Sequence, residues 1–175
     1  GILLLAMLSP VQVAEEMATL DVVTGGRATL GVAVGYADKE FVALGVDKAD
    51  RGPRFDEAIE LIKRIWTGER VEHDGRFFRI EGMQASVLPE QSPRPPIWVG
   101  GNSKPAVRRA ARTGDAWYVP PFPTHAALKE LLEVFDEERE RHGLPPAPEL
   151  PIRREVIVSD SKEEARKGAA MRSRA

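Results

Sequence analysis

The residues best suited to chemistry form a glycine-containing turn, Gly100-Gly101-Asn102-Ser103. The turn follows a short apolar run and precedes a predicted helix, because Ser103 can serve as an N-cap and Pro105 fits a first helical turn. Backbone N–H groups converge at such a turn, and the helix dipole adds positive potential, so the turn could hold a phosphate group. A purely structural corner between a strand and a helix is the alternative that the residues leave open.

Other polar residues are weaker candidates. His125 follows a predicted strand end, which would suit an acid or a substrate contact, but a solvated histidine at a helix start gives the same pattern. Asp38 and Glu40 lie in a long loop and could position a substrate. Salt bridges from these two carboxylates to Arg51 or Arg54 are the interpretation that we favour.

The composition is that of a globular chain. Its 175 residues, 42% hydrophobic and 30% charged, are enough for one core. The net charge of −2 argues against a nucleic-acid partner, and without a run of eighteen apolar residues no membrane span is expected. The chain has no cysteine, so a cytoplasmic setting is the default expectation. Its three scattered histidines do not predict a metal site.

Short apolar strands alternate with helical patterns along the chain. Each predicted strand is followed by a predicted helix, and the strands are residues 2–7, 28–34, 97–99, 116–119 and 152–158. Asp74-Gly75, within residues 71–80, predicts a β-hairpin inserted after the second helix. Five such units imply a parallel sheet covered by helices, either an open doubly wound sheet or a closed barrel. The glycine spacings of a dinucleotide fold and of a Walker loop are absent.

Several segments, in order, resemble the luciferase-like monooxygenase family. They are Thr19 to Arg27 (TLDVVTGGR), Gly31 to Tyr36 (GVAVGY), Glu40 to Val46 (EFVALGV), Asp56 to Ala58, Trp66 to Gly68, Ile97 to Ser103 (IWVGGNS) and Asp115 to Trp117. Each segment is a weak signal alone, but the ordered set covers nearly the whole chain and is specific. The sequences of these segments are most similar to the branch of F420-dependent oxidoreductases.

The resemblance implies a (β/α)8 TIM barrel that binds FMN or the deazaflavin coenzyme F420 at the C-terminal ends of its strands. Five units would be strands three to seven of the eight. A full barrel runs to about 250 residues, so residues 1–175 are expected to form a single, incomplete barrel domain, a fragment of the family fold. Between the two cofactors, F420 is the one that the resemblance favours.

The resemblance also implies which residues contact the cofactor. Ala6, Met7 and Leu8 are expected beneath the isoalloxazine ring, and Val34 and Gly35 beside the cofactor. The phosphate is expected at Gly100, Gly101, Asn102 and Ser103. Val119 and Pro120 are expected at the next strand end. Simple core packing is the alternative for Ala6, Met7 and Leu8. The family's polar catalytic residues are expected on strands outside this chain, which leaves His125 as the one weak catalytic candidate.

Two classes of function follow from these observations. The first is a flavin- or deazaflavin-dependent oxidoreductase or monooxygenase that acts on a small organic substrate, with a flavin or F420 reductase as its partner. The second is a non-catalytic barrel fragment, or an assembly partner without a complete site. Unpaired edges of an incomplete barrel favour association, so a homo-oligomer is expected. The hairpin is expected at the N-terminal face of the sheet, opposite the cofactor.

Overall fold

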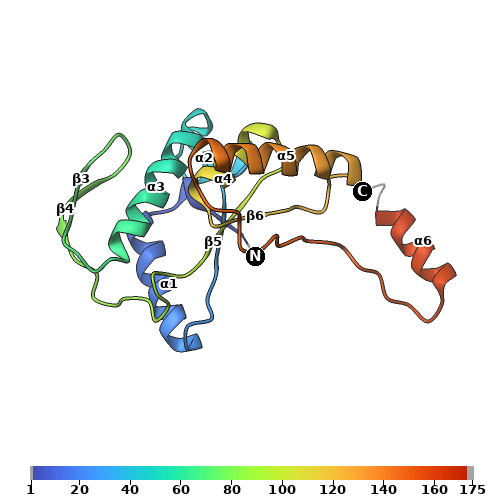
Figure 1. Cartoon of the computed structure of the whole chain (residues 1–175), viewed down its shortest axis with the longest axis horizontal. Helices are drawn as coiled ribbons and strands as arrows, with labels where there is room; N and C mark the ends of the chain where they lie inside the picture. Colours follow the sequence, from blue (N-terminus) through green and yellow to red (C-terminus); the bar gives the residue numbers. More distant parts are fainter. Residues whose placement is uncertain (1, 173–175) are drawn as a thin grey trace.

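The centre of the fold is a four-stranded parallel sheet (Figure 1). The structure is a computed structural model that describes residues 2–172. The strands are β1 (Leu3–Leu4), β2 (Leu30–Ala33), β5 (Ile97–Gly100) and β6 (Ala116–Tyr118), in the spatial order β1-β2-β5-β6. This order, with helices between successive strands, confirms the predicted α/β class.

The helices of the described residues are α1 (Pro10–Thr24), α2 (Asp38–Ala43), α3 (Arg51–Ile65), α4 (Lys104–Thr113), α5 (His125–Arg141) and α6 (Lys162–Arg172), with short 3-10 turns at Leu5–Met7 and Lys48–Asp50. Of these helices, α1, α3, α4 and α5 cover one face of the sheet. The strand residues that face α1, α3, α4 and α5 are buried in one core: Leu30, Val32, Ile97, Val99 and Trp117. Within residues 2–172, no helix is both long enough and apolar enough to cross a membrane.

The opposite face of the sheet carries the alternate residues of each strand, because successive side chains point to opposite sides. Leu4 pairs with Ala33, and Gly100 pairs with Tyr118, so these four residues form the layer nearest the C-terminal ends of the strands. Gly31, Trp98 and Ala116 form the layer below it. In a closed barrel this would be the inner face.

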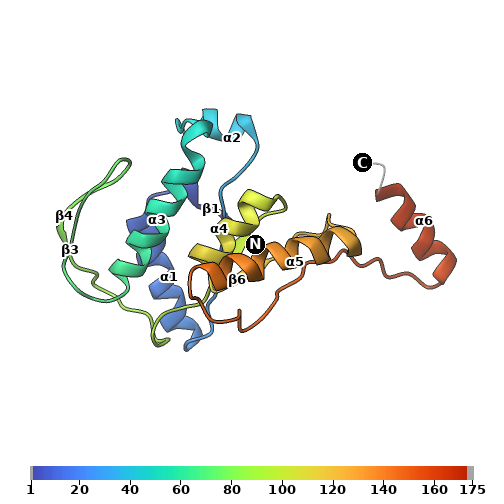
Figure 2. The same cartoon turned by 45° about the horizontal axis from the view of Figure 1, so that its top comes forward.

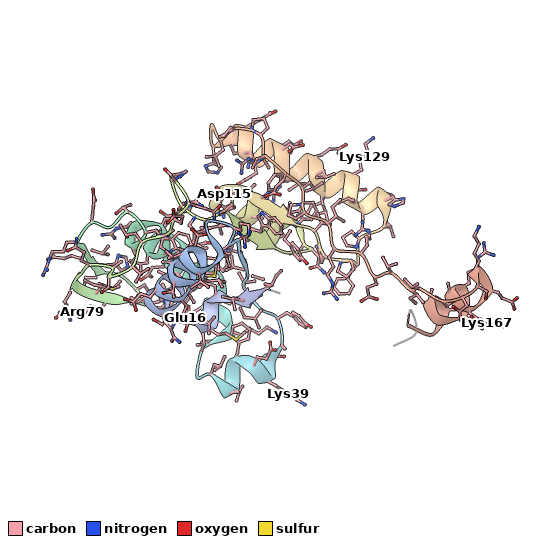
Figure 3. All side chains as sticks on the ribbon, turned by 90° about the horizontal axis from the view of Figure 1, so that it is seen from below. Glu16, Lys39, Arg79, Asp115, Lys129 and Lys167 are labelled. Carbon is pink, nitrogen blue, oxygen red and sulfur yellow. The ribbon has the colours of Figure 1, made fainter. Side chains whose placement is uncertain are left out.

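Two of the five predicted strands differ from the structure. The run at residues 2–7 forms only the two-residue β1, and Leu5–Met7 is a buried 3-10 turn whose Ala6 carbonyl accepts a hydrogen bond of 2.8 Å from Arg54 Nε. Residues 152–158 are not a strand, and only Ile152 forms a bridge, with Val119. Both segments lie at sheet edges, where a strand lacks one of its two neighbours. Beyond Ile152 the chain leads to α6, which stands apart from the sheet (Figure 3).

The predicted hairpin is confirmed, but its predicted position is wrong. β3 (Val71–Asp74) and β4 (Arg79–Met83) are antiparallel, with a turn closed by Gly75 N–H and the Phe78 carbonyl at 3.0 Å. The hairpin runs along the outer side of α3 (Figure 2). Its tip lies beside the start of α3, where Arg76 pairs with Asp50 at 2.6 Å. Because α3 begins near the C-terminal ends of the strands, the tip lies at that level and not at the N-terminal face.

Glu57 of α3 fixes the turn of this hairpin. Its carboxylate accepts hydrogen bonds from the backbone N–H of Phe77 and Phe78 and from His73 Nε2, the last at 2.9 Å. Burial alone would raise the pKa of Glu57, but these hydrogen bonds outweigh burial and lower it. A Cβ atom at Gly75 would overlap the Glu57 carboxylate and the His73 ring, so a side chain there would displace these two groups.

Asp21 ties the end of α1 to the segment that leads into β5. The residue is fully buried and accepts hydrogen bonds from Ala28 N at 3.1 Å, Gln91 N at 2.9 Å and Gln91 Nε2 at 2.7 Å. Burial alone would raise the pKa of Asp21, but hydrogen bonds, chiefly from Gln91, outweigh burial and lower it. The carboxylate thus joins segments 70 residues apart in the chain.

Candidate functional site

A cavity of about 470 Å³ opens at the C-terminal ends of all four strands of the sheet. Its floor is the upper inner layer of the sheet, formed by Leu4, Ala33, Gly100 and Tyr118. Leu4 and Ala33 have aliphatic side chains and Gly100 has none, so these three residues leave the space above them open to a ligand. This is the end of a parallel sheet at which α/β proteins bind their ligands.

The glycine turn and the start of α4 form one wall of the cavity. Gly100, Gly101, Asn102 and Ser103 all line it. Ser103 occupies the N-cap position, as predicted, but its side chain makes no capping hydrogen bond. Within the described chain the Ser103 hydroxyl has no hydrogen-bond partner, so it is available to a ligand.

Gly101 is required by packing inside the turn itself. An ideal Cβ atom at this position would lie 2.5 Å from Ala106 Cβ, a distance that side chains cannot adopt. The absence of a side chain at Gly101 therefore has a structural cause, whether or not a ligand approaches. A ligand-binding role for this glycine cannot be read from its identity.

Replacing Gly101 by alanine should lower the free energy of unfolding by about 1 to 3 kcal/mol, because the new methyl group overpacks against Ala106. Urea denaturation measures the loss. The double variant Gly101→Ala with Ala106→Gly is the control, since it removes the opposing methyl group. Equal losses in the single and double variants would contradict this account of Gly101.

Two cations that the sequence did not single out as ligand contacts, Lys48 and Arg51, line the cavity beside the turn. Lys48 pairs with Asp38 at 2.6 Å. Arg51 donates from Nη1 to the Lys48 carbonyl at 2.7 Å, and no carboxylate of the described residues lies within ion-pair distance of it. The predicted salt bridges from Asp38 and Glu40 to Arg51 or Arg54 are therefore wrong. The guanidinium of Arg51 keeps its charge uncompensated by protein.

Arg51 is held near the start of α4 by contacts between α3 and α4. Arg109 of α4 donates to Asp56 of α3 at 2.8 Å. The neighbour of Arg51, Gly52, packs so closely on Arg109 that a Cβ atom there would be 2.7 Å from Nη2. The first turn of α3, through Arg51, and the first turn of α4, through Ala106, both line the cavity.

Asp115 and Arg94 set the start of β5 and β6, and hence the height at which these strands reach the cavity. Asp115 accepts from Ile97 N at 2.8 Å and from both terminal nitrogens of Arg94 at 2.6 and 2.9 Å. Burial alone would raise the pKa of Asp115, but hydrogen bonds, chiefly from Arg94, outweigh burial and lower the pKa.

Charge distinguishes the cavity from the rest of the surface. Its lining contains Lys48, Arg51 and Arg153 and, among the residues that the structure describes, no aspartate or glutamate. An apolar rim follows the ends of β2 and β6 and includes Tyr36, Pro121 and Phe122. This division suits a ligand with an anionic end and an apolar, ring-like part.

The structure brings together most, but not all, of the predicted cofactor contacts. Those that line the cavity are Val34, Gly35, Gly100, Gly101, Asn102, Ser103 and Pro120. Val119 and Ala6 are fully buried and do not line the cavity. His125 is exposed at the start of α5, outside the lining.

Met7 and Leu8 face a different cavity, of about 420 Å³, which lies under the hairpin tip. Met7 also packs against Gly35, where a Cβ atom would be 2.6 Å from Met7 Cε and where φ is +82°. Met7 therefore supports the wall of the main cavity from behind. Met7 is buried, as the core-packing alternative expects, whereas Leu8 is half-buried and lines this second cavity.

Comparison with known proteins adds the family. Residues 1–175 match the family model described as luciferase-like monooxygenase. The chain is 30% identical over 163 residues to the oxygenase component of the flavin-dependent trigonelline monooxygenase of Acinetobacter baylyi. This match covers 91% of this chain and 45% of that protein. It is 32% identical over 161 residues to the FMNH2-dependent dimethylsulfone monooxygenase of Pseudomonas putida, covering 90% and 44%. The chain thus spans less than half the length of these relatives.

Solved structures show the same fold. Monooxygenase RslO1 from Streptomyces bottropensis superimposes with a TM-score of 0.87 at 24% identity, covering 99% of this chain and 54% of that one. An F420-dependent secondary alcohol dehydrogenase superimposes with a TM-score of 0.74 at 22% identity, covering 82% and 44%. The predicted incomplete barrel is confirmed, and the chain belongs to the luciferase-like monooxygenase family.

Proposed function

We propose that this chain forms the phosphate-binding part of the cofactor site of a flavin-dependent monooxygenase. The observation that carries the proposal is the uncompensated guanidinium of Arg51, which shares one cavity with the free hydroxyl of Ser103. Arginine binds phosphate through several N–H groups at once, and a charged acceptor makes those hydrogen bonds strong. The N-terminus of α4, at the same wall, favours negative charge as well.

The residues of the cavity fit a flavin mononucleotide. Ser103 and Arg51 would hold the phosphate, and the aliphatic floor with the apolar rim would receive the flat ring. When bound, the flavin supplies the redox chemistry through which a monooxygenase uses oxygen. The protein side of this cavity orients the cofactor, and it excludes water from the ring through Leu4, Val34 and Phe122.

FMN is the cofactor that the relatives support. Both curated relatives are named for a flavin or FMNH2, whereas F420, the cofactor favoured by the sequence resemblance, occurs in the name of a structural neighbour at 22% identity. The substrate is a small organic molecule, and a reductase that supplies reduced flavin is the expected partner. A homo-oligomer is proposed as well, because both edges of the sheet lack a neighbouring strand along most of their length.

Titration of the full-length protein with FMN, riboflavin and F420 tests the cofactor, with absorbance and fluorescence of the ligand as the readout. FMN should bind at least tenfold more tightly than riboflavin, because only FMN carries the phosphate. Tighter binding of F420 than of FMN would overturn the choice of cofactor. Binding of neither would favour the non-catalytic fragment or assembly partner.

A further inference from the structure

Tyr118 provides the one hydroxyl group on the floor of the cavity. The floor is the layer Leu4, Ala33, Gly100 and Tyr118, and the first three offer no polar side-chain atom. The side chain of Tyr118 is half-buried, and within residues 2–172 its hydroxyl has no hydrogen-bond partner. A half-buried phenol on an otherwise apolar floor is a fixed donor for whatever lies above it.

The layer below holds this phenol in place. The ring of Trp98 stacks on the ring of Tyr118, with centroids 6.0 Å apart and planes 17° from parallel. Trp98 fits because its neighbours in the same layer, Gly31 and Ala116, are small. Trp98 Nε1 in turn donates to Glu149 Oε1 at 2.8 Å. Glu149 therefore orients the Trp98 ring, and the Trp98 ring in turn orients the Tyr118 ring that lines the cavity.

We propose that Tyr118 is a cofactor-binding residue whose hydroxyl donates a hydrogen bond to a carbonyl oxygen of the flavin ring. This inference rests on the proposed function, because it assumes that a flavin occupies the cavity. The floor next to Tyr118 is apolar, as the face of a ring requires, and Tyr118 belongs to β6, the last strand of the sheet, where its hydroxyl can serve a ring carbonyl group. Trp98 and Glu149 are positioning residues that act through Tyr118.

The test uses three ligands on the full-length protein: FMN, riboflavin and lumiflavin, which is the ring without ribityl chain or phosphate. Tyr118→Phe should weaken all three by a similar factor of about three to ten, because the lost hydrogen bond belongs to the part that they share. Thr19→Val is the control. Its hydroxyl donates to the Glu15 carbonyl at 2.9 Å on the exposed side of α1, outside the cavity lining, so its loss should change the affinity for none of the three ligands.

The outcomes separate this inference from the proposed function. If the wild-type protein binds none of the three ligands, the proposed function fails. If the wild type binds them but Tyr118→Phe leaves lumiflavin affinity unchanged, the assignment of Tyr118 to the ring is wrong. A loss confined to FMN would also overturn it, because that would place the phenol at the phosphate.

The positioning role has its own test. Glu149→Ala should weaken lumiflavin binding about twofold, and Glu149→Gln, which keeps an oxygen acceptor for Trp98 Nε1, should restore it. In the Tyr118→Phe background, Glu149→Ala should have no further effect, because the coupling runs through the phenol. Equal effects in both backgrounds would show that Glu149 does not act through Tyr118.

Discussion

Replacing Asp21 by alanine is expected to lower the free energy of unfolding by about 3 to 5 kcal/mol, the largest loss of any single substitution considered for this chain. The carboxylate is fully buried and accepts three hydrogen bonds, two of them from backbone N–H groups of Ala28 and Gln91. Its removal leaves the buried N–H of Ala28 and the partly buried N–H of Gln91 without their acceptor, and a buried unsatisfied donor costs about 1 to 3 kcal/mol. Urea denaturation with an unchanged m-value measures the loss.

Glu16→Ala is the matched control on the same helix. Glu16 is exposed and accepts one hydrogen bond, from Gln12 at 2.8 Å, so its removal should cost no more than about 0.5 kcal/mol. A loss for Asp21→Ala as small as the loss for Glu16→Ala would show that the buried hydrogen bonds of Asp21 do not stabilise the fold.

The same carboxylate makes stability depend on pH. The pKa of Asp21 is lower in the folded chain than in the unfolded chain, so its contribution is fully present above the unfolded pKa, near pH 4. The contribution is lost as the pH falls through the folded pKa. Asp21→Asn should flatten the stability profile below about pH 4, which urea denaturation at a series of pH values would reveal.

Asp21 also shows what the sequence could not predict. The apolar spacing of α1 predicts that Val13, Met17 and Leu20 face inward, and Val13 and Met17 do. Leu20 is 47% exposed, and Asp21 takes the buried position beside it. The partner that makes a buried aspartate favourable, Gln91, lies 70 residues away, and no local pattern identifies such a pair.

The central strands were predictable because their environment is complete. β2 and β5 have neighbouring strands on both sides and helices on one face. β2 lies within the predicted strand 28–34, and β5 extends the predicted strand 97–99 by one residue. At the edges, residues 2–7 are equally apolar, whereas residues 152–158 include Arg153, Arg154 and Glu155. Both segments lack a second neighbour, and neither forms a full strand. Strand length at an edge depends on pairing, which the sequence of one segment does not contain.

The site was predictable to a similar degree. The glycine turn was identified from its own residues, and Tyr118 could have been found from alternation, because Trp117 points into the core and its neighbour must point the other way. Lys48 and Arg51 reach the cavity only because residues 36–54 fold into α2 and a 3-10 turn. Loop conformation of that kind has no periodic signal.

Arg51→Gln should weaken FMN binding by about 10- to 150-fold, which corresponds to roughly 1.5 to 3 kcal/mol for a hydrogen bond to a charged group. Riboflavin, which has no phosphate, should bind with unchanged affinity. The contrast between the two ligands separates loss of a phosphate contact from damage to the cavity. Fluorescence titration of the full-length variant with each flavin is the measurement.

Arg153→Gln is the matched charge control, because it removes the same charge from the same cavity beyond β6, away from Ser103. Arg153 already pairs with Glu155 at 3.6 Å, so its loss should change FMN affinity no more than about twofold. Equal losses in the two variants would mean that FMN responds to the overall positive potential of the cavity. In that case Arg51 would not be a phosphate ligand, and Ser103 with the start of α4 would remain as the phosphate site to be tested by Ser103→Ala.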